Sequence, residues 1–317
     1  MGKTALLFPG QGAQFVGMGR DVAARYPEAQ ALYDRADAVL GFGLSAICFE
    51  GPEDRLTATD VSQPTVLVTS LAVLAALRTT PAGQALRVEA AAGLSLGEYT
   101  ALAAAGALAF DDAVRLTHLR GRLMQEACDA APGGMVSLIG VDEAGAEKIC
   151  GAAQEAGIIR PANYNCPGQV VVSGVRAACE KVVAIAESMG AQRAIPLAVA
   201  GGFHSPLMTP ARERLAPQLQ GLRVRELAFP VVANVTGDYY SGAASAADLL
   251  ARQVDGPVRW QQGVERLIRD GFDRFVEVGP GRVLIGLLKR IDRRLAKAAA
   301  AVGTVEDIEA FGKGGEG

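Results

Sequence analysis

The sequence predicts an α/β fold, in which a mostly parallel sheet is covered by helices on both faces. Three short apolar stretches, at residues 4–8, 88–92 and 275–278, are each followed by a glycine-containing turn and then by a helical pattern. This repeated order is typical of α/β proteins. Glycine supplies 38 of the 317 residues, well above the usual ~7%, and many of these glycines lie in the turns.

The helices of this fold are expected where apolar residues recur at helical spacing. The first turn, at residues 9–12, leads into a helical region that ends near Leu40. A long helix is expected after the turn at residues 62–64. The remaining helices of the large fold are expected at residues 98–109, 113–126 and 283–288.

The middle of the chain has a different order: strand, helix, strand, strand, helix, strand. The strands are expected at residues 136–140, 158–164, 170–173 and 193–197, and the helices at residues 142–156 and 175–189. This is the ferredoxin-like order. We therefore expect a small domain at residues 133–199, inserted into a larger domain formed by residues 1–132 and 200–317.

Composition excludes several classes of protein. With 50% hydrophobic and 21% charged residues, the chain is expected to be globular and folded. Its net charge of −3, without a long basic run, argues against a nucleic-acid partner. The apolar stretches at residues 66–77 and 100–110 are shorter than the ~20 residues that span a bilayer, and no secretory signal is recognisable. We expect a cytoplasmic monomer that does not insert into membranes.

No cofactor or metal ion is expected either. The closest cysteines, Cys166 and Cys179, are thirteen positions apart, which is unlike a zinc or disulfide framework. Each cysteine is expected to be a small buried apolar residue. The two glycine-rich segments that resemble phosphate loops, at residues 2–4 and 10–15, lack the glycines that such loops need.

The strongest functional signal is the segment Gly93-Leu94-Ser95-Leu96-Gly97. A G-x-S-x-G segment occurs by chance in glycine-rich chains, but this one lies between a predicted strand and a predicted helix. That position is typical of a nucleophile elbow. In so tight a turn, a Cβ two residues before or after the serine would collide with backbone. The turn exposes the hydroxyl of Ser95 and directs the Leu96 amide toward an oxyanion.

A nucleophilic serine needs a base, and the chain has two histidines. His118 lies in a predicted helix, where packing or surface roles are usual. His204 lies in a glycine-hinged loop at residues 201–206, and loops commonly carry functional side chains. We therefore predict His204 as the base. Because no acidic residue stands out as a third member, a backbone or amide carbonyl is expected to orient its ring.

Six segments together resemble one known family. The sequence is similar to malonyl-CoA:acyl carrier protein transacylases over residues 4–290, through segments at residues 8–14, 93–99, 120–125, 163–170, 203–205 and 277–281 that occur in the same order. Members of that family have an α/β-hydrolase-like large domain with a ferredoxin-like insertion. The resemblance implies the same architecture here.

The resemblance also implies roles for the catalytic residues. Ser95 would accept the acyl group, and His204 would act as general base and acid. Gln11 would lie beside the oxyanion, whose hole the Leu96 amide completes. The main-chain carbonyl of Gln253 would steady the histidine.

Further roles concern the substrate. Arg120 would bind the free carboxylate of malonyl, and two parallel hydrogen bonds from a guanidinium are a strong way to select a carboxylate. Phe203 would disfavour an α-methyl branch on the acyl group, and Asn165 would lie near the site. One residue departs from the family pattern, because Leu94 stands where most bacterial members have histidine.

The expected reaction is therefore a ping-pong acyl transfer. Malonyl-CoA would acylate Ser95, and the phosphopantetheine thiol of acyl carrier protein would then take the malonyl group for fatty acid synthesis. Three alternatives remain open from sequence: a malonyltransferase of polyketide synthesis, a serine thioesterase or other hydrolase with the same elbow, and a carrier-binding module without activity. Neither metal nor redox cofactor is implied.

Overall fold

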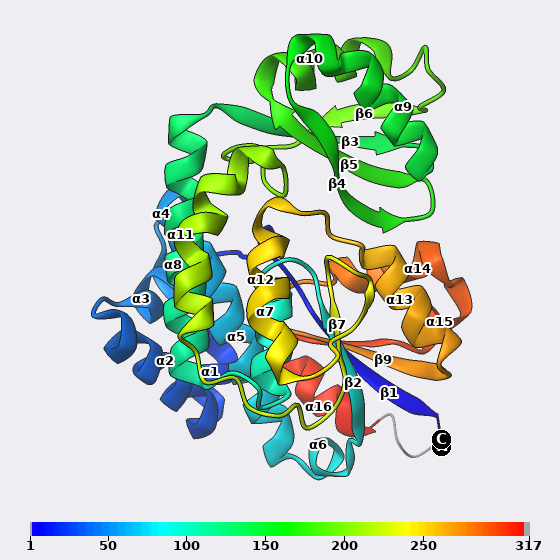
Figure 1. Ribbon diagram of the computed structural model, residues 1–317. Coiled ribbons are helices and arrows are strands. Elements are labelled where there is room, and N and C mark those ends of the chain that lie inside the picture. Colours follow the sequence, from blue (N-terminus) through cyan, green and yellow to red (C-terminus); the bar gives the residue numbers. More distant parts are fainter. Residues whose placement is uncertain (1, 314–317) are drawn as a thin grey trace.

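The computed structural model describes residues 2–313. Met1 and residues 314–317, at the two outer ends of the predicted large domain, lie outside the described residues. The chain forms one six-stranded and one four-stranded sheet with helices around both (Figure 1). The predicted α/β class is confirmed.

The large sheet has the strand order β10-β9-β1-β2-β7-β8. The three predicted strands lie side by side in it, as β9, β1 and β2. All neighbouring strands are parallel except the edge strand β8, which is antiparallel to β7. The bounds of these strands are β1 (Lys3–Phe8), β2 (Val88–Gly93), β7 (Val231–Ala233), β8 (Asp238–Tyr239), β9 (Phe272–Val278) and β10 (Ala300–Val302).

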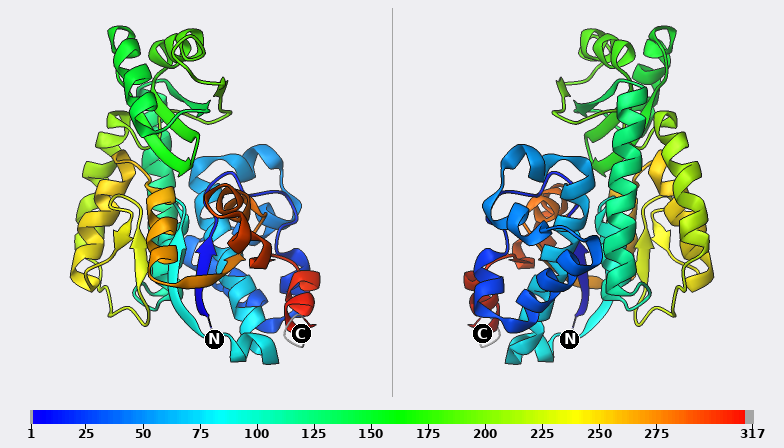
Figure 2. Two further views of the ribbon diagram at one scale, coloured as in Figure 1. Left: turned by 90° about the vertical axis from the view of Figure 1, so that its right-hand side faces the viewer. Right: turned by 90° about the vertical axis from the view of Figure 1, so that its left-hand side faces the viewer.

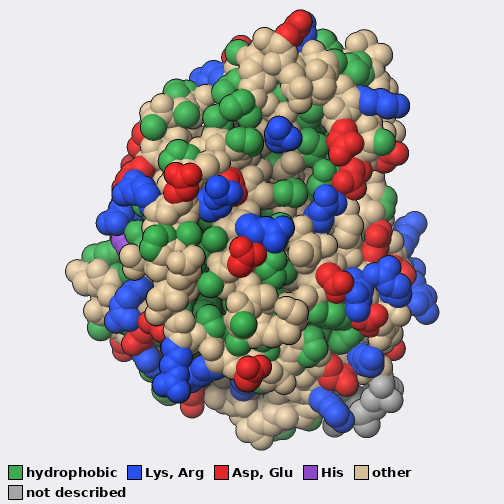
Figure 3. All heavy atoms as spheres, in the orientation of Figure 1, with side chains coloured by type: hydrophobic (Ala, Val, Ile, Leu, Met, Phe, Trp, Pro, Cys, Tyr) green, Lys and Arg blue, Asp and Glu red, His purple; other side chains and the backbone are tan. Residues whose placement is uncertain are grey.

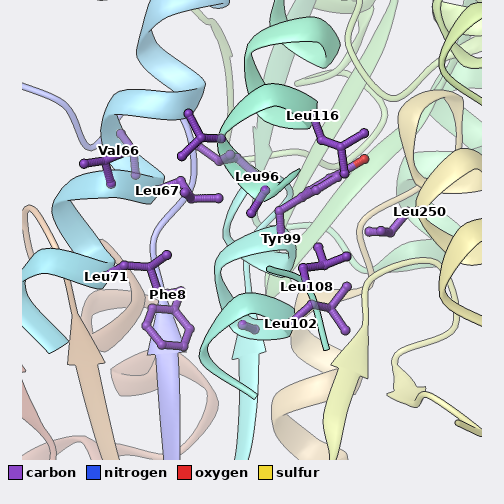
Figure 4. Packing of buried hydrophobic residues seen from close by; sticks show 14 of the residues in the cluster. Phe8, Val66, Leu67, Leu71, Leu96, Tyr99, Leu102, Leu108, Leu116 and Leu250 are labelled. Atoms are coloured by element: carbon purple, nitrogen blue, oxygen red, sulfur yellow. The ribbon is translucent and has the colours of Figure 1, made fainter. Parts of the chain in front are cut away.

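Both faces of the large sheet are buried because side chains alternate along each strand. In β1, Leu6 and Phe8 join the core formed with α5, α7 and α8, whereas Ala5 and Leu7 join the core formed with α13, α14 and α15. Figure 4 shows Phe8 beside side chains of α5 and α7. The helices outside the four-stranded region are α1 (Arg20–Arg25), α2 (Pro27–Leu40), α3 (Leu44–Glu50), α4 (Glu53–Thr57), α5 (Thr59–Thr79), α6 (Pro81–Ala85), α7 (Gly97–Ala104), α8 (Phe110–Ala130), α11 (Thr209–Gln220), α12 (Ala246–Asp255), α13 (Trp260–Arg269), α14 (Val283–Ile291), α15 (Arg293–Ala298) and α16 (Val305–Lys313).

The four-stranded sheet is antiparallel, with the order β4-β5-β3-β6. Its elements follow the predicted order: β3 (Gly133–Ile139), α9 (Glu143–Ala153), β4 (Ile159–Cys166), β5 (Gln169–Val175), α10 (Arg176–Ile185) and β6 (Arg193–Pro196). Val136 and Val172 pack against α9 and α10, whereas Met135 and Val171, on the opposite face, join the core of the large sheet. Figure 2 shows this sheet next to one end of the long helix α8.

Several predicted helix boundaries are wrong; the helix predicted at residues 175–189, for example, ends at Ile185. The helix predicted at residues 98–109 ends at Ala104, because Gly106 has a φ of 75° and turns the chain before α8 begins at Phe110. The long helix begins at Thr59 rather than after residue 64, so Pro64 lies inside it. Proline has no backbone N–H to donate to the carbonyl four residues earlier.

His118 compensates for that missing donor. The carbonyl of Asp60, four residues before Pro64, lies 2.9 Å from His118 Nδ1. The ring of His118 also contacts that of Phe42, with the ring centroids 5.6 Å apart. His118 therefore has the packing role that its helical position predicts.

Helix α5 is longer than the apolar stretch seen in the sequence. Within residues 2–313, it is the one helix long and apolar enough to cross a membrane, but 83% of its most apolar window is buried inside the protein.

The five cysteines are all buried free thiols. Burial raises the pKa of both Cys48 and Cys150 to about 12, so these two thiols are neutral apolar residues.

The carboxylate of Glu277 caps the start of α14 from the end of β9. Glu277 is 0% exposed, and its two oxygens accept hydrogen bonds from the backbone N–H groups of Leu284 (3.0 Å) and Ile285 (2.9 Å). The first N–H groups of a helix have no partner within the helix. Glu277 therefore has a structural role.

Candidate active site

The nucleophile elbow connects β2 directly to α7. Ser95 has a φ of 50°, an unusual value for a residue with a side chain. A Cβ on Gly93 would lie 1.9 Å from the carbonyl carbon of Gly97, and a Cβ on Gly97 would lie 2.1 Å from the carbonyl oxygen of Phe8. Only glycine fits at these two positions, as the sequence predicts.

Asn234 holds this strained turn in place. It follows β7, the neighbour of β2 in the sheet. Its Oδ1 accepts a hydrogen bond from the Ser95 N–H (2.6 Å), and its Nδ2 donates to the carbonyl of Gly93 (2.7 Å). Sequence reasoning missed Asn234, because the three-residue strand before it is too short to be recognised.

His204 lies within hydrogen-bond distance of the nucleophile. Its Nε2 is 2.7 Å from Ser95 Oγ, and its Nδ1 is 2.8 Å from the main-chain carbonyl of Gln253. Because a carbonyl only accepts, Nδ1 carries the proton and Nε2 accepts from the serine hydroxyl. Burial, followed by the charge of Arg120, lowers the pKa of His204 to about 4. The imidazole is therefore neutral and able to accept a proton near pH 7.

This low pKa predicts an unusual pH profile for acylation of Ser95. For acylation by acetyl-CoA, which has no free carboxylate, we expect kcat/KM to stay nearly constant from about pH 8 to about pH 5, and to fall only as the pH approaches the His204 pKa of about 4. An ordinary histidine would lose half of this rate near pH 6.5. Stopped-flow measurement of acylation, with circular dichroism to confirm folding at each pH, checks the profile. A midpoint near pH 6.5 would contradict it.

Arg120 is a buried cation next to the nucleophile. It is 1% exposed, and its Nη2 donates to Ser95 Oγ (3.1 Å) and to Gln253 Oε1 (2.9 Å). Its Nη1 donates to Gln63 Oε1 (2.6 Å), and its guanidinium lies 5.5 Å from the ring centroid of Tyr99. Burial lowers its pKa.

All these partners of Arg120 are uncharged. No carboxylate pairs with Arg120 within residues 2–313, and its buried Nε has no hydrogen-bond partner there. A buried charge is normally paired. The arrangement is therefore suited to an anionic group on a molecule bound at Ser95.

A cavity of about 560 Å³ brings the predicted residues together. It lies between the carboxyl ends of the large-sheet strands and the face of the small sheet that carries Met135 and Val171. The predicted residues that line it are Gln11, Leu94, Ser95, Arg120, Asn165, Phe203 and His204.

The other two predicted residues, Leu96 and Gln253, are buried beside this cavity. Leu96 immediately precedes α7, so its amide lies at the N-terminus of that helix. Among residues 2–313, no protein group accepts a hydrogen bond from the Leu96 N–H.

Gln63, which lies behind the cavity wall, and Asn165, which lines the cavity, add polar groups near the nucleophile. Gln63 Nε2 donates to Gln11 Oε1 at 3.4 Å, so Gln63 connects Gln11 with Arg120. Asn165 has a buried Oδ1 without a hydrogen-bond partner in the described chain. Sequence reasoning missed Gln63, which belongs to no recognised motif and lies in the helix α5.

A serine at a strand-to-helix elbow, paired with a neutral histidine, defines a class of enzymes that transfer or hydrolyse acyl groups through a serine ester. Comparison with known proteins narrows this class. Residues 5–310 match the acyl transferase domain family, and the chain belongs to that family.

Among its relatives, a malonyl CoA-acyl carrier protein transacylase from Bacillus subtilis is 42% identical over 310 residues, 98% of this chain and 96% of the relative. A crystal structure of an acyl-carrier-protein S-malonyltransferase from Bartonella henselae is 39% identical, with a TM-score of 0.92, covering 97% of this chain and 98% of that one. A malonyl-transacylase in complex with a type II PKS acyl-carrier protein is 38% identical, with a TM-score of 0.92, covering 98% of this chain and 99% of that one.

Proposed function

We propose that this chain transfers a malonyl group from coenzyme A to the phosphopantetheine thiol of an acyl carrier protein, through an ester on Ser95. The names of the relatives support this reaction. One observation carries it: the buried guanidinium of Arg120 lies 3.1 Å from Ser95 Oγ and has no carboxylate partner in the described chain. Malonyl supplies that carboxylate, whereas acetyl does not.

In the first half of the reaction, His204 Nε2 takes the proton of Ser95 Oγ as the oxygen attacks the thioester carbonyl. The Leu96 N–H and the side chain of Gln11 stabilise the negative charge on the carbonyl oxygen. The C–S bond then breaks, and the sulfur of coenzyme A leaves with the proton from His204. Malonyl remains as an ester on Ser95.

The second half runs in the opposite direction. His204 takes the proton of the carrier thiol, the sulfur attacks the ester carbonyl, and the ester C–O bond breaks. Ser95 regains its proton from His204, and the malonyl thioester of the carrier leaves. Each half-reaction exchanges one thioester or ester bond and one proton, and we propose no metal ion or redox cofactor for it.

The cavity supports a preference among acyl groups. Arg120 would bind the far carboxylate, and Phe203, which is buried at the cavity wall, would restrict space beside the α-carbon. Methylmalonyl is therefore proposed as a poor substrate. Asn165 would accept a hydrogen bond from the bound substrate through its buried Oδ1. Leu94 lines the same cavity, where most bacterial relatives would place histidine.

Timing the release of coenzyme A tests this proposal. Mixing the protein with malonyl-CoA should release one equivalent of coenzyme A rapidly, and further release should require carrier protein. Mass spectrometry should find malonyl on the peptide that contains Ser95. Steady release without carrier would indicate a hydrolase, and the absence of an adduct would indicate a carrier-binding module without activity.

The pathway depends on the carrier. We propose fatty acid synthesis, and the neighbour solved with a type II PKS acyl-carrier protein supports a polyketide carrier as the alternative. Transfer rates measured with one carrier of each kind distinguish the two.

The architecture proposed from sequence has support in the order of the strands. We propose that residues 133–199 form a ferredoxin-like domain inserted into an α/β-hydrolase-like domain of residues 1–132 and 200–317. We also propose a cytoplasmic monomer without nucleic-acid or membrane partners. On the face in Figure 3, Lys and Arg side chains are interspersed with Asp and Glu, which is unlike a nucleic-acid-binding surface.

A further inference from the structure

A buried carboxylate lies directly behind the nucleophile. Glu98, the second residue of α7, is 0% exposed and does not line the cavity. Its Oε1 accepts a hydrogen bond from the hydroxyl of Tyr240, and its Oε2 accepts one from Gln253 Nε2 (2.6 Å). A buried carboxylate without a cation in direct contact is costly to maintain, and the reaction described above gives it no role.

The contacts of Gln253 link this carboxylate to the reacting groups. Both hydrogens of Gln253 Nε2 are used, one by Glu98 and the other by the carbonyl of Ser95 (2.7 Å). Its Oε1 therefore faces Arg120 and accepts from Nη2 (2.9 Å). If the amide were reversed, its oxygen would face two acceptors and its NH₂ group would face the guanidinium. A carboxylate at position 98 disfavours that reversal, because it can only accept.

We infer that Glu98 is a positioning residue for malonyl transfer: it fixes the orientation of the Gln253 side-chain amide, and through that amide it holds Arg120 beside Ser95. This inference rests on the proposed function, because it concerns how the carboxylate-binding group of that function is placed. Glu98 contacts neither the substrate cavity nor the oxygen of the nucleophile. Its hydrogen bond with Gln253 Nε2 links it to these groups.

Glu98 could instead act on the substrate through its negative charge. The two possible roles, orienting the Gln253 amide and repelling the malonyl carboxylate, predict opposite changes in substrate preference when Glu98 is neutralised. Burial raises the pKa of Glu98 to about 7, against the lowering by donors on Tyr240, Gln253 and the Asn234 backbone and by the charge of Arg120. Above that pH its negative charge would repel a malonyl carboxylate. If Glu98 acted mainly through charge, its neutralisation would favour malonyl. If it acts through the amide, neutralisation disfavours malonyl.

Glu98→Gln tests the inference at about pH 8, where the wild-type carboxyl is ionised. Malonyl-CoA and acetyl-CoA loading are compared by the ratio of their kcat/KM values. We expect this ratio to fall about tenfold, the loss of one hydrogen bond to a charged group. Gln253→Leu should lower the ratio by a similar factor, and the double variant should lower it no further, because both changes break one chain of contacts.

Glu277→Gln is the matched control. It neutralises another carboxylate that is 0% exposed but caps α14 outside the cavity, so its ratio should equal that of the wild type. An unchanged or increased ratio in Glu98→Gln would overturn the inference. If Glu98→Gln does not fold, an unchanged ratio in Gln253→Leu would overturn it equally. Wild-type protein that forms the Ser95 adduct in the same assay shows that only the inference, and not the proposed function, has failed.

Discussion

Replacement of Ser95 by alanine is expected to abolish malonyl loading, with the rate of coenzyme A release lowered by about 10⁴-fold or more. The reason is that the ester oxygen is lost, while the cavity, His204 and Arg120 remain. Alanine tolerates the φ of 50° about as well as serine does, so the fold should be preserved. Rapid-quench measurement of coenzyme A release, together with mass spectrometry of the Ser95 peptide, checks this result.

Ser173→Ala provides a matched control. The Ser173 hydroxyl is also buried, but it lies in β5 and has no hydrogen-bond partner in the described chain. Its loss should leave loading unchanged. His204→Ala should be nearly as severe as Ser95→Ala, and the double variant should be no worse than either, since the two residues act as one unit. An intact malonyl adduct in Ser95→Ala would place the nucleophile elsewhere.

Arg120→Ala is expected to lower kcat/KM for malonyl loading by about 10²-fold, which corresponds to about 3 kcal/mol of charge-assisted hydrogen bonding. Acetyl loading should fall much less, so acetyl should improve relative to malonyl. The physical reason is that removal of the guanidinium takes a hydrogen-bond partner away from the malonyl carboxylate, whereas acetyl has no carboxylate. Steady-state transfer with both acyl-CoA substrates measures the change in ratio.

Arg120→Lys separates charge from geometry. Lysine keeps the positive charge but cannot make two parallel hydrogen bonds, so its malonyl preference should fall between those of the wild type and Arg120→Ala. Arg120 also donates to Ser95 Oγ, so some loss for acetyl is expected as well. Equal losses for both substrates would remove Arg120 from the carboxylate-binding role and leave it as a support for the nucleophile.

Local sequence was sufficient wherever local sterics decide the structure. The strand before Ser95, the glycines on each side of it and the helix after it predict the elbow, because a Cβ at residue 93 would collide with the backbone of Gly97. The same reasoning failed at the start of the helix predicted after residue 64, which begins at Thr59. There, His118, which is 58 positions away from Asp60, supplies the donor that Pro64 lacks.

The polar network around the nucleophile could not be predicted in this way. Asn234 lies 139 positions from Ser95, and Gln63 lies 57 positions from Arg120. Asn234 and Gln63 carry no charge, and neither belongs to a recognised motif. Their roles depend on which strand ends and helix faces meet, and that pairing is a long-range property of the sheet.

By itself, the sequence predicted the α/β class, the elbow, His204 rather than His118 as the base and, through its resemblance to a family, Arg120 as the residue proposed to bind the carboxylate. Only the tertiary structure decided the protonation of His204, the absence of a carboxylate partner for Arg120 among the described residues, and the contacts of Gln253 with Glu98. The reason is physical: turns and helices follow from neighbours along the chain, whereas burial, pKa and hydrogen-bond partners follow from segments that meet only after folding.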